Sequence, residues 1–283
     1  MSIQTIGIIG AGQMGSGIAQ VCAQNGYTTF LTDAAQEFVD RGAARILGAW
    51  DTMESKGKIS HDDVLLYRSR LRPTMNLQDY VACDVVIEAI IENKAEKVKI
   101  FRALDDLLRP EALLLSNTSS ISLTEIAAVT KRADRVAGLH FFNPAPVMKL
   151  VEIVRALETS DATVETLKEF AASLGKTAVI AKDTAGFIVN FLLIPYLLAA
   201  IRMYENGTAS MEDIDTAMKL GTGYPMGPFT LADYVGLDTT LFAAEVIYAD
   251  NPDPAYAPPP LLKRMVAAGR LGKKSGRGFY TYE

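Results

Sequence analysis

Cysteine and histidine are scarce in this 283-residue chain, which contains two of each. Cys22 and Cys83 have none of the short spacings of zinc or redox motifs, and two cysteines do not make a disulfide framework. We therefore expect both to be small core residues in a reducing compartment. The same scarcity argues against a bound metal.

An excess of basic charge is also absent. Lys and Arg number 28 against 33 Asp and Glu, so the formal net charge is -5, and no positive field attracts nucleic acid or an anionic membrane. The longest apolar stretch, Phe187–Ile201, is interrupted by Asn190 and Pro195 and is shorter than a membrane span requires. The first residues lack the basic and then apolar pattern of a signal peptide. We expect a cytoplasmic protein without nucleic-acid or membrane partners.

What is present is an alternation of strands and helices over the first two thirds of the chain. Strands alternating with helices at this spacing predict an α/β fold with a Rossmann-like doubly wound sheet. The charged stretch 36–70 predicts two helices that break near Lys56–Lys58, a helical hairpin inserted in this domain. The expected strands are residues 5–9, 27–31, 84–90, 112–115, 136–142, 150–154 and 177–180.

The pattern changes after Thr184. Apolar residues then recur at helical intervals over 186–203, 211–220 and 229–247, with a Pro-rich loop at 251–260. We therefore predict two domains, a Rossmann-like nucleotide-binding domain at 1–184 and an all-α domain at 185–283.

The segment GAGQMG at residues 10–15 matches the dinucleotide-binding fingerprint. It follows an expected buried strand and opens a helix, which is the context in which the motif binds a pyrophosphate rather than forming a plain turn. Asp33 ends the second strand about twenty residues later, where a carboxylate holds the ribose 2′-hydroxyl. Since Asp33 repels a 2′-phosphate and no arginine adjoins it in the sequence, we predict NAD as cofactor. The alternative is that Asp33 only forms a turn at the end of the strand.

His140 is the candidate base. It ends an apolar strand, whereas His61 lies in a polar segment and is expected at the surface without a role. A neutral imidazole beyond a strand's carboxyl end can remove a hydroxyl proton. Glu152 lies in the next apolar strand, and a turn between the two strands would bring it to His140 to fix the tautomer of the ring. A structural histidine, and an ion pair of Glu152 with Arg155 or Lys149, remain the alternatives.

Two further polar groups stand out. Asn117–Ser120 follows a strand and offers hydroxyl and amide donors at its carboxyl end, although capping of the next helix would explain it too. Asn190 is a single amide in an apolar helix and must be hydrogen-bonded, either to a substrate or to a neighbouring helix.

These motifs together resemble the 3-hydroxyacyl-CoA dehydrogenase family, and within it the bacterial 3-hydroxybutyryl-CoA dehydrogenases. The resemblance covers essentially all of the chain. Besides the glycine fingerprint it rests on NTSS at 117–120, HFFNP at 140–144 with Glu152, GF at 186–187 with Asn190, PMGP at 225–228, GLD at 236–238 and GKKSGRGFY at 272–280.

The resemblance implies reversible NAD-dependent oxidation of an (S)-3-hydroxyacyl-CoA, with four-carbon chains favoured. His140 would be the general acid/base, oriented by Glu152, and Ser119 and Asn190 would bind the substrate oxygens. Lys56 would contact the CoA, and the C-terminal domain would bind substrate and form a homodimer. The cofactor site would consist of Gly10, Gly12, Gln13, Met14, Gly15, Asp33, Glu92, Lys97, Ser119, Asn143 and Lys274.

The chain departs from the family pattern at several positions, and these concern the acyl pocket, interdomain contacts and the CoA site: Ala49, Phe191, Leu198, Ala199 and Tyr224. Two other functions stay open on sequence alone. One is a dehydrogenase of a free hydroxy acid, of the gulonate type, and the other is a non-catalytic NAD-binding protein on the same fold. The retained Ser119, His140, Glu152 and Asn190 argue against the second.

Overall fold

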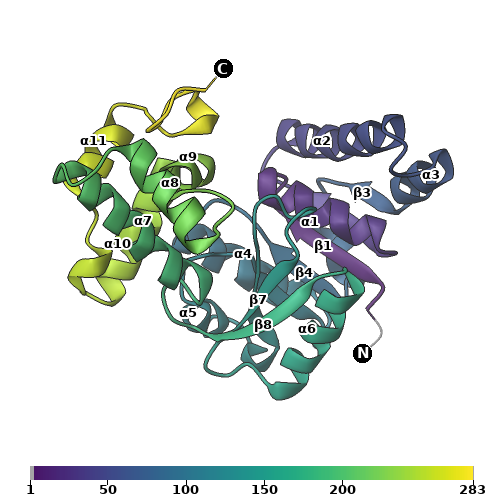
Figure 1. The fold of residues 1–283 in the computed structure, drawn as a ribbon. Helices are drawn as coiled ribbons and strands as arrows, with labels where there is room; N and C mark the ends of the chain where they lie inside the picture. Colours follow the sequence, from purple (N-terminus) through teal and green to yellow (C-terminus); the bar gives the residue numbers. More distant parts are fainter. Residues whose placement is uncertain (1–2, 283) are drawn as a thin grey trace. The chain divides into compact units, whose positions relative to one another are not determined.

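A computed structural model describes residues 3–282 of the protein (Figure 1). Its contacts divide the chain into two compact units, which separate between Thr184 and Ala185. In residues 3–282, none of the helices combines the length and the apolarity needed to cross a bilayer.

The first unit is built on one eight-stranded sheet with the order β3-β2-β1-β4-β5-β6-β7-β8. Every neighbouring pair is parallel except β6 and β7, which are antiparallel. The predicted fold class is therefore confirmed, with one antiparallel pair in a sheet whose centre is parallel. The strands are β1 (Thr5–Ile9), β2 (Thr28–Thr32), β3 (Leu71–Pro73), β4 (Val85–Glu88), β5 (Leu113–Ser116), β6 (Val136–Phe141), β7 (Leu150–Arg155) and β8 (Thr177–Lys182).

The central strands β4, β5 and β6 are buried along their whole length, which is why they read as apolar runs without alternation. Helices cover the sheet as crossovers between parallel strands (Figure 1). These are α1 (Gln13–Gln24), α2 (Gln36–Ser55), α3 (His61–Arg70), α4 (Lys94–Leu107), α5 (Leu123–Ala127) and α6 (Asp161–Ser173), with short 3-10 helices at Leu77–Ala82 and Ala133–Arg135.

The charged stretch after β2 forms the helical hairpin α2–α3. Lys56 caps α2, Gly57 turns the chain with a φ of +66°, and Ser60 and Asp63 form a capping box that starts α3. The rings of Trp50 and Tyr67 hold the two helices together at 5.7 Å. The sequence pattern did not indicate β3, because three residues are too few to show a strand periodicity.

The second unit is helical. Its helices are α7 (Val189–Glu205), α8 (Met211–Thr222), α9 (Pro228–Val235), α10 (Leu237–Asp250) and α11 (Pro260–Ala267), with 3-10 helices at Pro254–Tyr256 and Lys273–Ser275. Its apolar core includes Leu198, Phe229 and Ile247. Asp233 is fully buried and accepts hydrogen bonds from the backbone N–H groups of Phe279 and Tyr280, so it fixes the tail of the chain to α9.

Both thiols are buried in the first unit, and burial raises the pKa of Cys22 and of Cys83 to about 12. The thiolate is the reactive form, so neither residue should react with a disulfide reagent in the native protein at mildly alkaline pH. Titration with Ellman's reagent should give no thiol in the native protein and two in denaturing guanidinium chloride. Rapid modification of one native thiol would contradict this.

Candidate active site

The polar segments of the first unit gather at the carboxyl edge of its parallel strands. The strand order β2-β1-β4 shows that the chain continues to one side of β1 and then crosses to the other, so the sheet has a topological switch point between β1 and β4. Ligands of open α/β sheets bind at the carboxyl ends of the strands beside such a point. Segments 10–12, 89–93 and 117–120 and His140 all lie at this edge.

The glycine loop after β1 has the geometry of a phosphate site. A Cβ atom at Gly15 would lie 1.8 Å from the carbonyl oxygen of Gly10, so the loop and α1 approach too closely for a side chain. A Cβ at Gly12 would meet no atom within 4 Å, and no side chain caps the N-terminus of α1 there. Open space before uncapped helical N–H groups, where Gln13 and Met14 begin α1, fits the pyrophosphate of a dinucleotide.

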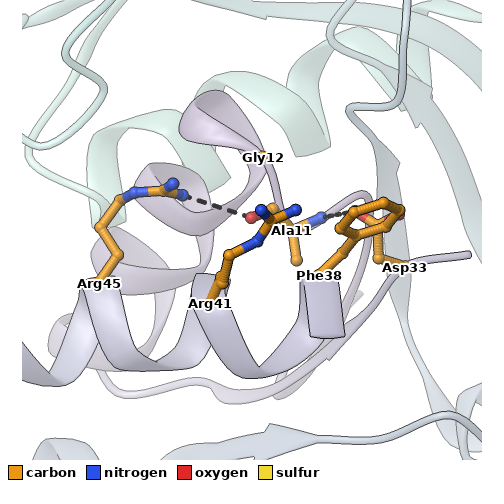
Figure 2. A pocket seen from close by; sticks show the side chains of 6 residues that line it. All are labelled: Ala11, Gly12, Asp33, Phe38, Arg41 and Arg45. Atoms are coloured by element: carbon orange, nitrogen blue, oxygen red, sulfur yellow. Dashed lines mark hydrogen bonds between the residues drawn. The ribbon is translucent and has the colours of Figure 1, made fainter. Parts of the chain in front are cut away.

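Asp33 follows β2 and faces this loop. Its two carboxylate oxygens accept hydrogen bonds from the N–H groups of Ala11 and Ala34, both at 2.6 Å. A cavity of about 180 Å³ lies beside it, lined by Ala11, Gly12, Asp33, Phe38, Arg41 and Arg45 (Figure 2). Two backbone N–H groups thus fix the carboxylate of Asp33 beside this cavity.

A buried ion cluster supports the next loops. The ammonium of Lys97, whose side chain is 1% exposed, lies 2.6 Å from Oε1 of Glu88 and 3.2 Å from Oε2 of Glu92. Ser116 donates a hydrogen bond to the other oxygen of Glu88 at 2.7 Å, which joins β4 to β5. Two carboxylates therefore share one cation beneath the carboxyl edge of the sheet.

Glu92 extends this cluster to the loop after β5. It accepts hydrogen bonds from the hydroxyls of Thr118 and Ser120 and, at 3.1 Å, from the N–H of Ser119. Burial alone raises the pKa of Glu92, but the charge of Lys97 and these hydrogen bonds outweigh burial and hold the pKa below its usual value. Ser119 is consequently fixed by a carboxylate that stays ionised.

The turn after β6 brings Glu152 to His140. The two residues are direct partners in the antiparallel register of β6 and β7, and Nδ1 of His140 lies 2.7 Å from Oε2 of Glu152. A carboxylate that accepts this hydrogen bond places the ring proton on Nδ1. Glu152 is fully buried and lies against His140, whereas Arg155 forms an ion pair with Asp161.

The neighbours of His140 hold the same edge in place. Asn117 accepts a hydrogen bond from the N–H of Phe141 at 2.8 Å, which ties the end of β5 to the end of β6. Asn143 accepts one from the Nε2 amide of Gln13 at 3.0 Å, so the loop after β6 contacts the first turn of α1. The His140 ring also packs 4.6 Å from that of Phe142.

Four other residues named from the sequence belong to other segments of the chain. His61 is exposed as predicted, and its Nδ1 lies 2.8 Å from Glu54. Lys56 is exposed at the end of α2. In the second unit Asn190 lies in the first turn of α7, and Lys274 forms an ion pair with Asp238 at 2.6 Å.

Sequence reasoning missed Glu88, Arg41 and Arg45. Glu88 had a usable signal, since it is a carboxylate inside an apolar strand, the same feature that singled out Glu152. The two arginines had none, because on a charged helix nothing in the sequence tells which side chains turn toward the glycine loop.

Comparison with known proteins agrees with this geometry. The family model for the 3-hydroxyacyl-CoA dehydrogenase NAD binding domain matches residues 5–184, and the model for the C-terminal domain of the same enzymes matches residues 186–282. The chain is 48% identical to the 3-hydroxybutyryl-CoA dehydrogenase of Mycobacterium tuberculosis, over 99% of both proteins. It is 46% identical to the human mitochondrial hydroxyacyl-coenzyme A dehydrogenase, over 99% of this chain and 92% of that protein.

A solved structure gives the same result. The crystal structure of (S)-3-hydroxybutyryl-CoA dehydrogenase PaaH1 from Ralstonia eutropha superposes with a TM-score of 0.95 and 45% identity, and each chain is covered completely.

Proposed function

The chain belongs to the 3-hydroxyacyl-CoA dehydrogenase family and is an NAD-dependent enzyme of that kind, and from this premise we propose that its substrate is (S)-3-hydroxybutyryl-CoA. The reaction is the reversible oxidation of the 3-hydroxyl group to a ketone, which gives acetoacetyl-CoA. Similarity to bacterial enzymes that carry this substrate in their names, over the full length of the chain, supports the four-carbon acyl group.

The first unit would hold NAD along the carboxyl edge of its sheet. NAD supplies the acceptor for the hydride that leaves C3 of the substrate. The N–H groups at Gly10–Gly15 would bind the pyrophosphate, and the fixed carboxylate of Asp33 would accept from the ribose hydroxyls. Glu92 and Asn143, on the loops beyond β4 and β6, would bind the other half of the cofactor, and Lys97 would hold Glu92 from beneath. From the second unit, Lys274 would complete this set.

The hydrogen-bonded pair His140–Glu152 is the observation that supports the chemistry. With the proton of the ring on Nδ1, we assign Nε2 of His140 as the atom that takes the 3-hydroxyl proton while the C3 hydride departs, and that returns the proton in ketone reduction. The buried carboxylate of Glu152 orients the ring and stabilises the imidazolium that forms. Ser119 and Asn190 would donate hydrogen bonds to the substrate oxygens.

Further proposals concern the binding of CoA, the oligomeric state and the compartment of the protein. Exposed Lys56, at the tip of the α2–α3 hairpin, would pair with a phosphate of CoA. The chain would act as a homodimer through its C-terminal unit. Cys22 and Cys83 are both buried and expected to be unreactive, which suits the reducing cytoplasm in which we place the protein.

The experiment follows NADH oxidation by the purified protein with acetoacetyl-CoA, free acetoacetate and a longer 3-ketoacyl-CoA. We expect turnover on the order of 1–10³ s⁻¹ with acetoacetyl-CoA, slower turnover with the longer thioester and none with the free acid. Faster turnover with the longer thioester would overturn the four-carbon assignment. Turnover with the free acid alone would show the hydroxy-acid dehydrogenase that the sequence left open.

A further inference from the structure

Helix α2 packs directly against the glycine loop. A Cβ atom at Gly42 would lie 2.7 Å from both the Cβ and the carbonyl oxygen of Ala11, so the helix and the loop touch there. Residues three and four apart share one face of a helix. Phe38, Arg41 and Arg45 consequently flank this contact and line the cavity beside Asp33 (Figure 2).

Two guanidinium groups thus lie beside the ribose site. Arg45 donates a hydrogen bond to Oγ of Ser16 at 2.9 Å and lies 3.4 Å from the carbonyl oxygen of Ala11, while Arg41 lies 4.8 Å over the Phe38 ring. For residues 3–282, neither guanidinium has a carboxylate oxygen within the 4.0 Å of an ion pair. The lining of the cavity therefore includes two guanidinium groups outside any ion pair and a single carboxylate, Asp33.

This lining suits a phosphate as well as a ribose hydroxyl. Guanidinium groups bind phosphate oxygens strongly, and arginine is the residue that receives the 2′-phosphate in NADP-binding sheets. We propose that the cavity is a masked site for an adenosine 2′-phosphate, in which Arg41 and Arg45 are the phosphate ligands and Asp33 alone excludes the group. The preference for NAD then depends on one carboxylate in an otherwise cationic pocket.

The test compares binding of 2′,5′-ADP and ADP by calorimetry, without substrate or turnover. The Asp33→Ser variant should bind 2′,5′-ADP at least about tenfold more tightly than the unaltered protein does, because a repelling charge is lost while both arginines remain. The double variant Asp33→Ser with Arg41→Ala should bind 2′,5′-ADP about tenfold more weakly than Asp33→Ser alone, since each charge-assisted hydrogen bond is worth roughly a factor of ten. Its affinity for ADP should change less than about twofold. Arg45→Ala should act in the same direction.

A matched control removes one positive charge elsewhere. Arg102 is exposed on α4 and is not part of the cavity lining, so Asp33→Ser with Arg102→Ala should bind 2′,5′-ADP as Asp33→Ser does. Equal losses from Arg102→Ala and Arg41→Ala would overturn the proposal, because net charge would then explain both. A folded Asp33→Ser protein that binds 2′,5′-ADP no more tightly than the unaltered protein would also overturn the proposal.

The Asp33→Ser change removes two hydrogen bonds to the backbone and could unfold the glycine loop. A second variant therefore leaves Asp33 and the loop unaltered. Arg41→Ala alone should weaken the low residual affinity for 2′,5′-ADP by about tenfold and leave ADP binding within about twofold. An unchanged affinity for 2′,5′-ADP would mean that Arg41 does not face the 2′ position.

Discussion

Replacing His140 with alanine should lower kcat for acetoacetyl-CoA reduction by about 10²–10⁴-fold, the range that a positioned acid/base contributes. The imidazole pairs with Glu152 through Nδ1 and is assigned here the proton transfer at the 3-oxygen. The glycine loop and Asp33 do not depend on this ring. NADH affinity, measured by fluorescence titration, should therefore stay within about threefold of the unaltered value, since no cofactor contact is assigned to the imidazole.

The chain offers a matched control, because it has only one other histidine. His61 is exposed and pairs with Glu54 on the hairpin, so His61→Ala should leave kcat and the KM values unchanged. Near-normal turnover of His140→Ala, with a folded protein and normal NADH binding, would refute the assigned role.

Glu152→Gln tests the positioning role of the carboxylate. The side chain keeps its shape, but its amide can present an N–H group to Nδ1 and so favour the wrong tautomer of His140. We expect kcat to fall by about 10²-fold or more while NADH affinity and the unfolding transition change little. Loss of stability without a change in kcat would reduce Glu152 to a structural partner.

The pairing of His140 with Glu152 shows what a sequence can predict. Both residues interrupt apolar strands, and a short Pro-rich turn between the strands leaves antiparallel pairing as the simple arrangement. Burial of a charge demands a partner, so position and chemistry point to the same contact. The glycine fingerprint and Asp33 are predictable for the same reason, since strand, turn and helix follow one another locally.

Arg41 shows where such reasoning stops. It follows Asp33 by eight residues, and the sequence around Asp33 contains no arginine that would suggest a phosphate site. Only the path of α2, which packs against Ala11 through Gly42, turns the guanidinium toward the cavity. Side chains on a charged helix are set by tertiary packing, which periodicity does not report.

Lys97→Met should give the largest loss of stability of any change considered. Methionine keeps the length of the side chain but removes the cation that lies between Glu92 and the fully buried Glu88. Breaking a buried ion pair from one side costs about 3–5 kcal/mol, because the partner charges stay behind uncompensated. Urea unfolding followed by circular dichroism measures the difference. Lys131→Met is the matched control, because its ion pair with Asp106 is exposed and its loss should not move the midpoint detectably.

The loss should also depend on pH in a defined direction. In the unaltered protein the pKa of Glu92 is lowered, so this group contributes stability above its ordinary pKa, and the contribution is lost as the pH falls through the lowered value. Burial acts in the opposite sense, and without Lys97 the pKa of Glu92 moves upward. The variant then binds a proton in the folded state at a pH where the unaltered protein does not. The difference in unfolding free energy between the two proteins should therefore widen as the pH is raised from acid toward neutrality. A difference that stays constant with pH would mean that Lys97 stabilises the fold by packing alone and does not hold the ionised Glu92 beneath the Ser119 loop.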